Sequence, residues 1–374
     1  MNQLLLISLP VFALLIAAEW LYGWKIGRLT YRLNDAVSSL SQGLLSQAIA
    51  VCTKLFQIGL YSIIFGKLAL FPKLAWWHSV WGWVAAIVLF DFCDYWLHRA
   101  GHEIAILWAA HMVHHQSEDF NFSTALRQES FVPLFGWLFY VPMAIIGVPP
   151  EQFALAGLIV LVYQFWIHTE HIGKLGWFDR IFSSPSNHRV HHAINPEYIN
   201  KNYGGMFILW DRLFGTFAVE QEACVYGTQT PLDSWDPLWA VTSGYAALLQ
   251  DALRTRRWRD KLRIWFMPTG WRPADVADGA CAISSEPVEI RRFDPPLKRS
   301  QLVFVIGEFV LLATITLMLL LREEMLDETH AVLLCLAIAS GLWVIGAMLQ
   351  SRMRLFTALI VTVPITIVAS LGLM

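Results

Sequence analysis

Residues 80–102 read VWGWVAAIVLFDFCDYWLHRAGH, an apolar run that ends in a pair of histidines. A helix needs about 20 mostly apolar residues to cross a bilayer, and the stretch from about 77 to 97 meets that requirement. His98 and His102 are four positions apart, so they share one face if the helix continues through them. The stretch therefore predicts a membrane helix that presents two imidazoles where it leaves the bilayer.

The composition of the whole chain agrees with a membrane protein. Hydrophobic residues make up 56% of the 374 residues and charged residues only 15%, whereas soluble proteins contain about 25% charged residues. The net charge of -2 gives no indication of a nucleic-acid partner. The five cysteines form no CxxC pair, which argues against a disulfide framework or a thiolate metal site.

Eight stretches qualify as candidate spanning helices. Seven of them lie near residues 4–24, 77–97, 131–147, 151–169, 302–321, 331–349 and 355–373. The eighth, near 43–66, carries Lys54, so a re-entrant or interfacial helix is the alternative there. We therefore expect an all-α, polytopic integral membrane protein with about eight transmembrane helices.

The distribution of basic residues predicts how these helices are oriented. Most Lys and Arg side chains fall in segment 174–300, so the positive-inside rule places that segment in the cytoplasm and both termini on the opposite side. Within it, residues 235–266 combine tryptophans and leucines with a run of basic residues. This pattern is typical of an amphipathic helix in the headgroup plane, and a helix packed on the protein's own cytoplasmic face is the alternative.

Clustered histidines are the main functional signal. Of the 12 histidines, eleven lie between residues 78 and 192, and HMVHH (111–115) and HRVHH (188–192) repeat an i, i+3, i+4 spacing. Imidazole is the commonest side-chain metal ligand. A tetrahedral zinc takes three or four protein ligands, so the eight imidazoles of the three motifs predict two metal ions. Ligand type alone leaves zinc, copper, iron and nickel open.

Two acidic residues lie beside the first motif. Asp94 precedes His98 by four residues and is expected to accept a hydrogen bond from a metal-ligating histidine, with an ordinary structural role as the alternative. Glu103 follows His102 directly and is a candidate ligand or proton carrier, with a solvated loop acid as the alternative. Both are treated as candidate catalytic residues.

The remaining histidines are interpreted from their positions. His168 ends a predicted span on the same side as the motifs. His171 follows it by three residues, and a lone histidine at a helix exit is more often not a ligand, so His171 stays outside the expected ligand set. The predicted topology places His78 and His330 on the opposite side of the membrane, where we expect bystanders.

In its motifs the chain resembles the fatty acid hydroxylase and sterol desaturase superfamily of membrane-bound diiron enzymes, which is marked by HxxxH, HxxHH and HxxHH after transmembrane segments. All three boxes are present in that order. Within the superfamily the chain is most similar to the alkylglycerol monooxygenase family, over about residues 80–240. The similarity is carried by HMVHHQSEDFNFSTALRQES (111–130), YQFWIHTE (163–170) and SPSNHRVHHAINPEYINKNYGGMFILWDRLFGTFAVE (184–220).

The resemblance implies a set of ligands and cofactors. Two iron ions would be held by His98, His102, His111, His114, His115, His168, His188, His191 and His192. The co-substrate would be O₂, and the external reductant in that family is a tetrahydropterin. The sequence shows no cytochrome b5-like, flavin or ferredoxin domain, so we expect electrons from a separate soluble or membrane-bound donor.

The reaction implied by the resemblance is hydroxylation at the ether-linked carbon of an alkylglycerol, which gives a fatty aldehyde and a glycerol derivative. The alternative is a sterol, carotenoid or fatty acyl hydroxylase or desaturase with a separate electron-donor protein. A zinc-binding or zinc-transporting membrane protein is disfavoured, because the histidines gather at one face instead of along a path at mid-membrane.

These inferences divide the chain into four regions and give it a location. The regions are N-terminal transmembrane helices (1–75), a histidine-box catalytic domain (76–220), a cytoplasmic amphipathic segment and linker (221–300) and a C-terminal three-helix transmembrane region (301–374). We expect a bacterial inner membrane or the endoplasmic reticulum, a lipid substrate drawn from that bilayer, and a diiron site that faces the cytoplasm.

Overall fold

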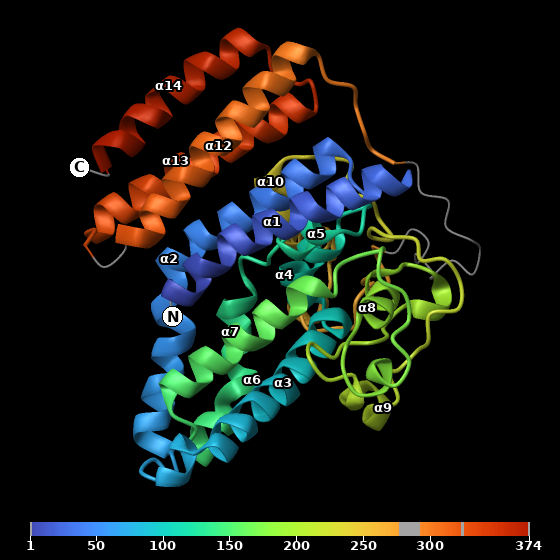
Figure 1. The fold of residues 1–374 in the computed structure, drawn as a ribbon, viewed down its shortest axis with the longest axis vertical. Helices are drawn as coiled ribbons and strands as arrows, with labels where there is room; N and C mark the ends of the chain where they lie inside the picture. The colour runs from blue at the N-terminus through green and yellow to red at the C-terminus, as the bar shows by residue number, and fades with distance from the viewer. Residues whose placement is uncertain (1, 277–291, 323–324, 373–374) are drawn as a thin grey trace.

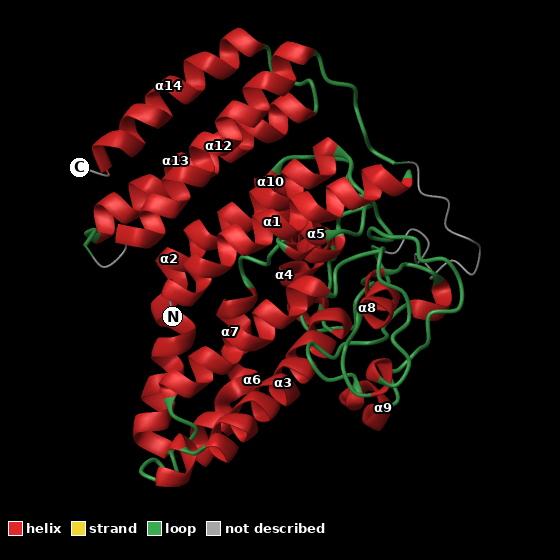
Figure 2. Cartoon of the chain, in the orientation of Figure 1, coloured by secondary structure: helices red, strands yellow, loops and turns green. Residues whose placement is uncertain are grey.

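The secondary structure of the protein is helical. The computed structural model describes residues 2–276, 292–322 and 325–372 (Figure 1). These residues form helices joined by loops, with isolated β-bridges and no β-strand (Figure 2). The predicted all-α class is therefore confirmed.

The helices follow one another in an order that separates the long apolar elements from a region of short helices and loops. The first half contains α1 (Asn2–Ile26), α2 (Leu33–Leu68), η1 (Ala75–His78), α3 (Val80–Glu103), α4 (Ala105–His115), α5 (Phe122–Ala125), α6 (Val132–Ile146) and α7 (Pro150–Trp166). The second half contains η2 (Phe178–Arg180), α8 (Pro185–His192), η3 (Pro196–Tyr198), α9 (Leu209–Phe214), α10 (Pro237–Arg254), α11 (Trp258–Arg263), α12 (Arg299–Arg322), α13 (Glu328–Leu349) and α14 (Leu355–Gly372). Helices α8 and α9 lie together among loops on one side of the long helices (Figure 1).

Several helices are suited to cross a bilayer. Four are long and apolar enough, namely Ser8–Ile26, Val80–Glu103, Arg299–Arg322 and Glu328–Leu349. The two parts of α2, Leu33–Thr53 and Phe56–Leu68, pass the same test together but are bent by 41°. The protein is thus a multi-pass membrane protein, but the predicted count of eight spans is not confirmed. Helices α6 and α7 have 15 and 17 residues, or about 22 and 25 Å, which is less than the roughly 30 Å of a hydrocarbon core.

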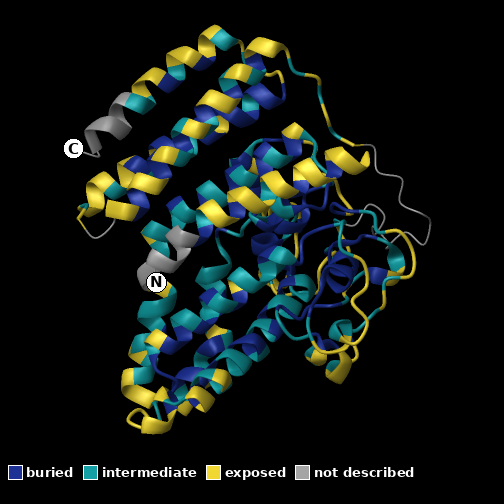
Figure 3. Ribbon diagram, viewed as in Figure 1, coloured by how far each residue is buried: buried dark blue, intermediate teal, exposed yellow. Residues whose placement is uncertain are grey.

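Two apolar cores hold the long helices together. In the first, aromatic rings of α2, α3, α6 and α7 stack on one another, including Tyr61 on Phe153 and Phe90 on Tyr140. In the second, α2 packs with α10, α12 and α13 around side chains such as Leu312. Helix α2 contributes to both cores, so it fixes the C-terminal helices against the helices that carry the histidines. Exposed residues run along the outer sides of α1, α12 and α14 (Figure 3).

The segment predicted as one amphipathic helix over 235–266 is divided into α10 and α11. The break follows Arg254 because the Asp275 carboxylate accepts hydrogen bonds from the Thr255 hydroxyl and the Arg256 backbone N–H, at 2.8 and 2.9 Å. The inner side of α10 packs on α4, where Gly244 lies against Ala109 and Met112. Packing on the protein itself is therefore present. The outer side of α10 exposes apolar residues such as Leu253, and α11 exposes Trp258. The contact of these helices with lipid headgroups stays a prediction.

Candidate metal centre

Three helical segments carry the histidine motifs to one place. Helix α3 extends through Glu103 and so keeps His98 and His102 on one face. Ile104 then adopts an extended conformation, with φ -114° and ψ 126°, and separates α3 from α4. The backbone of this connection pairs with the segment after α11, through Ala105 N–H to Met267 O at 3.0 Å. This pairing holds the first motif and the second at a fixed angle.

The third motif lies on a helix with a well-defined start. The Ser184 hydroxyl accepts a hydrogen bond from the Asn187 N–H, and Pro185 occupies the first helical position. Both features are typical of helix N-termini. Arg189, inside the motif, donates to the Thr169 and Ile172 carbonyls at 2.8 Å and to both oxygens of Glu220. The arginine thus attaches α8 to the chain that follows α7.

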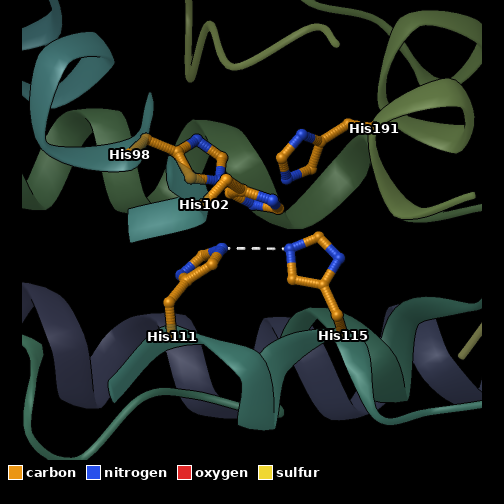
Figure 4. A group of neighbouring side chains, drawn as sticks. All are labelled: His98, His102, His111, His115 and His191. Atoms are coloured by element: carbon orange, nitrogen blue, oxygen red, sulfur yellow. Dashed lines mark hydrogen bonds between the residues drawn. The ribbon is translucent and has the colours of Figure 1, made fainter. Parts of the chain in front are cut away.

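The structure brings the nine predicted histidines into two groups. Group one consists of His98, His102, His111, His115 and His191 (Figure 4). Group two consists of His114, His168, His188 and His192. Within each group, one nitrogen of every ring lies within 4.8 Å of the others. Each group therefore has enough imidazoles, at a suitable spacing, to bind one metal ion, and group one has one more than a tetrahedral site needs.

The two HxxHH helices contribute to both groups. In each motif the first and last histidines enter the same group, because residues at i and i+4 lie close in angle around a helix. His111 and His115 belong to group one, while His114 points to group two. In α8 the assignment is reversed, since His188 and His192 belong to group two and His191 to group one. Helices α4 and α8 thus lie between the two groups.

Hydrogen bonds from Nδ1 orient five of the nine rings. The acceptors are Tyr203 O for His98 (2.7 Å), Glu129 Oε1 for His111 (2.5 Å), Arg127 O for His114 (2.9 Å), Gln164 O for His168 (2.7 Å) and Lys201 O for His191 (3.1 Å). A proton held on Nδ1 leaves the Nε2 lone pair available. Each of these rings therefore directs its ligating nitrogen toward its group.

The inner nitrogens have the surroundings expected of metal ligands. Among the described residues, the buried Nε2 atoms of His98, His102 and His191 have no hydrogen-bond partner. In group two, Nε2 of His188 lies only 3.0 Å from Nε2 of His168 and 3.1 Å from that of His192. Buried polar atoms without a partner are costly. A cation bound among them would satisfy both groups, so the residues fit a metal.

Burial also keeps the histidines in the form that binds metal. It lowers the pKa of His115, His188, His191 and His192 well below the usual value, and repulsion between neighbouring rings lowers it further. Neutral imidazole is the ligating species.

Glu129 is an acid of the site that the sequence patterns did not single out. Its carboxylate lies 2.5 Å from His111 Nδ1. Burial by itself would raise the pKa of Glu129, but the hydrogen bond from the His111 ring outweighs this effect and holds the pKa at about 2. The carboxylate is therefore ionised and anchors one ring of group one. No local motif marks it, because it follows His111 by 18 residues and lies in the loop before α6.

The two acids predicted beside the first motif occupy different positions. Asp94 lines the cavity described below and accepts a hydrogen bond from the Tyr140 hydroxyl at 2.9 Å. Glu103 pairs with Arg99 at 3.0 Å, and its side chain is 43% exposed. Within the described residues, neither acid belongs to a histidine group.

The three histidines left out of the expected ligand set lie outside both groups. His171 contacts the ring of Tyr22, at 5.2 Å between ring centroids. His78 ends η1, and His330 bonds to Asp327 near the start of α13.

A large cavity leads to both groups of histidines. Its volume is about 1070 Å³. At one end it is lined by His98 and His111 of group one and by His114 and His168 of group two. Most of its wall is apolar and comes from α1, α2, α6, α7 and α12, with residues such as Phe12. The cavity has the size and lining of a site for an apolar ligand.

Comparison with known proteins agrees with this arrangement. Residues 83–216 match the family model described as fatty acid hydroxylase. The alkylglycerol monooxygenase of Danio rerio is 37% identical over 350 residues, which cover 92% of this chain and 77% of the relative. That of Homo sapiens is 36% identical over 327 residues, which cover 86% and 71%. The ornithine lipid hydroxylase of Rhizobium tropici is 31% identical over 142 residues, which cover 38% and 43%. No solved structure matches the chain.

The helical membrane fold and the paired imidazole groups accompany a match of residues 83–216 to the fatty acid hydroxylase family model, so the protein is of the histidine-rich, membrane-bound class that this model describes. The two long alignments narrow the class further. The chain belongs to the alkylglycerol monooxygenase family.

Proposed function

We propose that the protein is an O₂-dependent monooxygenase that hydroxylates the ether-linked carbon of alkylglycerols and so yields a fatty aldehyde and a glycerol derivative. The observation that carries the proposal is the junction of two buried imidazole groups with an apolar cavity of about 1070 Å³. The long similarity to alkylglycerol monooxygenases supports the substrate class.

The cavity suits a lipid with one long chain. Apolar walls from α1 and α12, with residues such as Ile16, Phe309 and Leu317, would surround an alkyl chain. Each buried methylene contributes about 0.8 kcal/mol to binding. Since α1 and α12 have exposed apolar outer sides, both helices would contact the surrounding lipid, from which the substrate would be drawn. The ether linkage would then lie at the histidine end.

The proposed metals are two iron ions, one in each histidine group. Bound iron would supply the activation of O₂ and the removal of hydrogen from an unreactive C–H bond. The protein's own residues orient the imidazoles through Nδ1 hydrogen bonds. They also keep water away from the reacting carbon, because seven of the nine histidines are almost fully buried.

A tetrahydropterin is the proposed reductant, and the active site is proposed to face the cytoplasm, where such a soluble molecule is available. Basic residues concentrated in segment 174–300 support this orientation. A sterol or fatty acyl hydroxylase remains the second candidate. The sterol desaturases of Aspergillus fumigatus align with only 35% and 39% of the chain, which favours the first candidate.

The test is turnover of the iron-loaded protein in lipid nanodiscs with 1-O-hexadecylglycerol, a tetrahydropterin and O₂. We expect hexadecanal in amounts that depend on all three. An active enzyme that oxidises a sterol or an acyl lipid but gives no aldehyde from the ether would overturn the proposal. Iron measured on the same sample separates a wrong substrate from an unloaded enzyme.

A further inference from the structure

Two polar side chains lie in the cavity one helical turn from the histidines. On α3, Asp94 precedes His98 by four residues, and Gln164, near the end of α7, precedes His168 by four. All four residues line the same cavity. One turn corresponds to about 6 Å along a helix. The cavity therefore presents one polar group beneath each histidine group, away from the end where the histidines lie.

The two polar groups also lie close to each other. A Cβ atom built on Gly205 would lie 3.1 Å from Asp94 Oδ2 and 3.1 Å from Gln164 Nε2. These two atoms are therefore at most about 6 Å apart. Glycine at position 205 lets the backbone pass directly behind the pair. Any larger residue would displace the carboxylate or the amide.

Neither group is fully used by the protein itself. Asp94 accepts a hydrogen bond from Tyr140 through Oδ1. Within residues 2–276, 292–322 and 325–372, no hydrogen bond engages its Oδ2 or the side-chain amide of Gln164. The neighbouring Asp91, by contrast, uses both of its carboxylate oxygens and accepts three hydrogen bonds, from Met206, Phe207 and Trp210. The spare hydrogen-bonding capacity of Asp94 and Gln164 is therefore available to a ligand in the cavity that both residues line.

We propose that Asp94 and Gln164 bind the glycerol hydroxyls of the substrate, an inference that rests on the proposed function. A carboxylate accepts hydrogen bonds from hydroxyls, and an amide both donates and accepts them. An alkylglycerol carries its two hydroxyls beside the ether oxygen. Holding them one turn below the histidines places the adjacent ether-linked carbon at the imidazole groups, while the alkyl chain extends along α1 and α12.

This subsite would discriminate by chemistry as well as by size. A lipid without hydroxyls would leave the Asp94 oxygen and the Gln164 amide unpaired in an apolar cavity, which is costly. Sites built to bind a substrate hydroxyl reject analogues without it much more strongly than apolar pockets reject a change in length. The pair therefore acts as the determinant that selects glycerol ethers from other apolar lipids.

The experiment compares binding of 1-O-hexadecylglycerol with binding of hexadecyl methyl ether, which lacks hydroxyls. The full-length, iron-loaded protein is held without O₂ in nanodiscs, so that affinity is measured without turnover. The variants are Asp94→Asn and Gln164→Leu. The matched control is Gln250→Leu, which removes an exposed glutamine of α10 that is not among the described residues lining the cavity.

We expect both variants to weaken binding of the glycerol ether by about 10 to 100-fold and to leave binding of the methyl ether and the iron content unchanged. In turnover, KM for the glycerol ether should rise more than kcat falls. The control should match the wild type for both ligands. Wild-type affinity in both variants, or an equal loss for both ligands, would overturn the inference. Failure of the proposed function would show separately, as absence of aldehyde from the wild type.

Discussion

Replacing Glu129 with alanine removes the only side-chain carboxylate that bonds to a histidine of either group in the described residues. His111 Nδ1 would lose an acceptor at 2.5 Å and would keep a buried N–H without a partner. Leaving such a donor unpaired costs about 1–3 kcal/mol. Loss of a partner behind a metal ligand typically lowers metal affinity 10 to 100-fold, which corresponds to about 1.4–2.7 kcal/mol. The two estimates agree.

The assay is competition for iron between the protein and a chelator, with both ions counted. We expect Glu129→Ala to lower the affinity for the group-one ion about 10 to 100-fold and to leave the affinity for the group-two ion unchanged. The matched control is Gln128→Ala, whose side chain lines the same cavity but donates to Ala125 O instead of contacting a histidine. Wild-type affinity in Glu129→Ala, or an equal loss at both ions, would refute the reasoning.

The pH dependence of the contribution that Glu129 makes to iron affinity follows from the lowered pKa of its carboxyl group. A carboxyl whose pKa is about 2 in the folded protein is ionised throughout the neutral range. Its contribution is fully present above the ordinary value of 4.5 and is lost only as the pH falls from there toward 2. The ratio of the iron affinities of wild type and Glu129→Ala should therefore be the same at pH 6 and pH 8.

Three further substitutions probe the cavity and its supports. Ala313→Trp places a large side chain in the cavity at its α12 wall. In the wild type, kcat/KM should rise about fourfold for each methylene added to the alkyl chain of the substrate. In the variant this gain should be lost for the longest chains of an alkylglycerol length series. Glu220→Gln loses the ion pair with Arg189 and should destabilise the protein by about 1 kcal/mol at pH 7. That pair holds the pKa of Glu220 below its usual value despite burial. The difference in melting temperature between wild type and variant should therefore shrink as the pH falls below the ordinary pKa of the carboxyl group. Gly244→Val would bring a Cβ to 2.7 Å from Met112 Sδ and should cost about 1–3 kcal/mol and lower iron retention, whereas Gly307→Ala, with open space around it, should do neither.

Local patterns predicted the elements of the site well. The apolar run that ends at HRAGH became a helix, and the four-residue spacing placed His98 and His102 in the same group. The predicted set of nine histidines coincides with the two groups that the fold assembles. Periodicity was sufficient for the pairs at i and i+4, because such residues share a helical face whatever the rest of the chain does, whereas His168 entered the set through the family resemblance.

Features that depend on contacts between distant segments were not predictable in this way. The bond from Glu129 to His111 and the cavity wall of α12 arise from tertiary packing, which no local spacing encodes. The count of eight spans stays unconfirmed for another reason. Gly147 ends α6 in a left-handed conformation, with φ 104°, and α7 ends at Trp166, before the end of the predicted span 151–169. Apolar composition marks such stretches as candidate spans but does not fix where each helix ends.

The most direct test of the two-metal account is the iron content of single histidine variants purified anaerobically in lipid. The wild type and the control His330→Ala should hold two ions per chain. His191→Ala, which removes a ligand of group one, and His188→Ala, which removes one of group two, should each retain about one. One ion in the wild type, or zinc alone, would contradict the account, and so would two ions in both His191→Ala and His188→Ala.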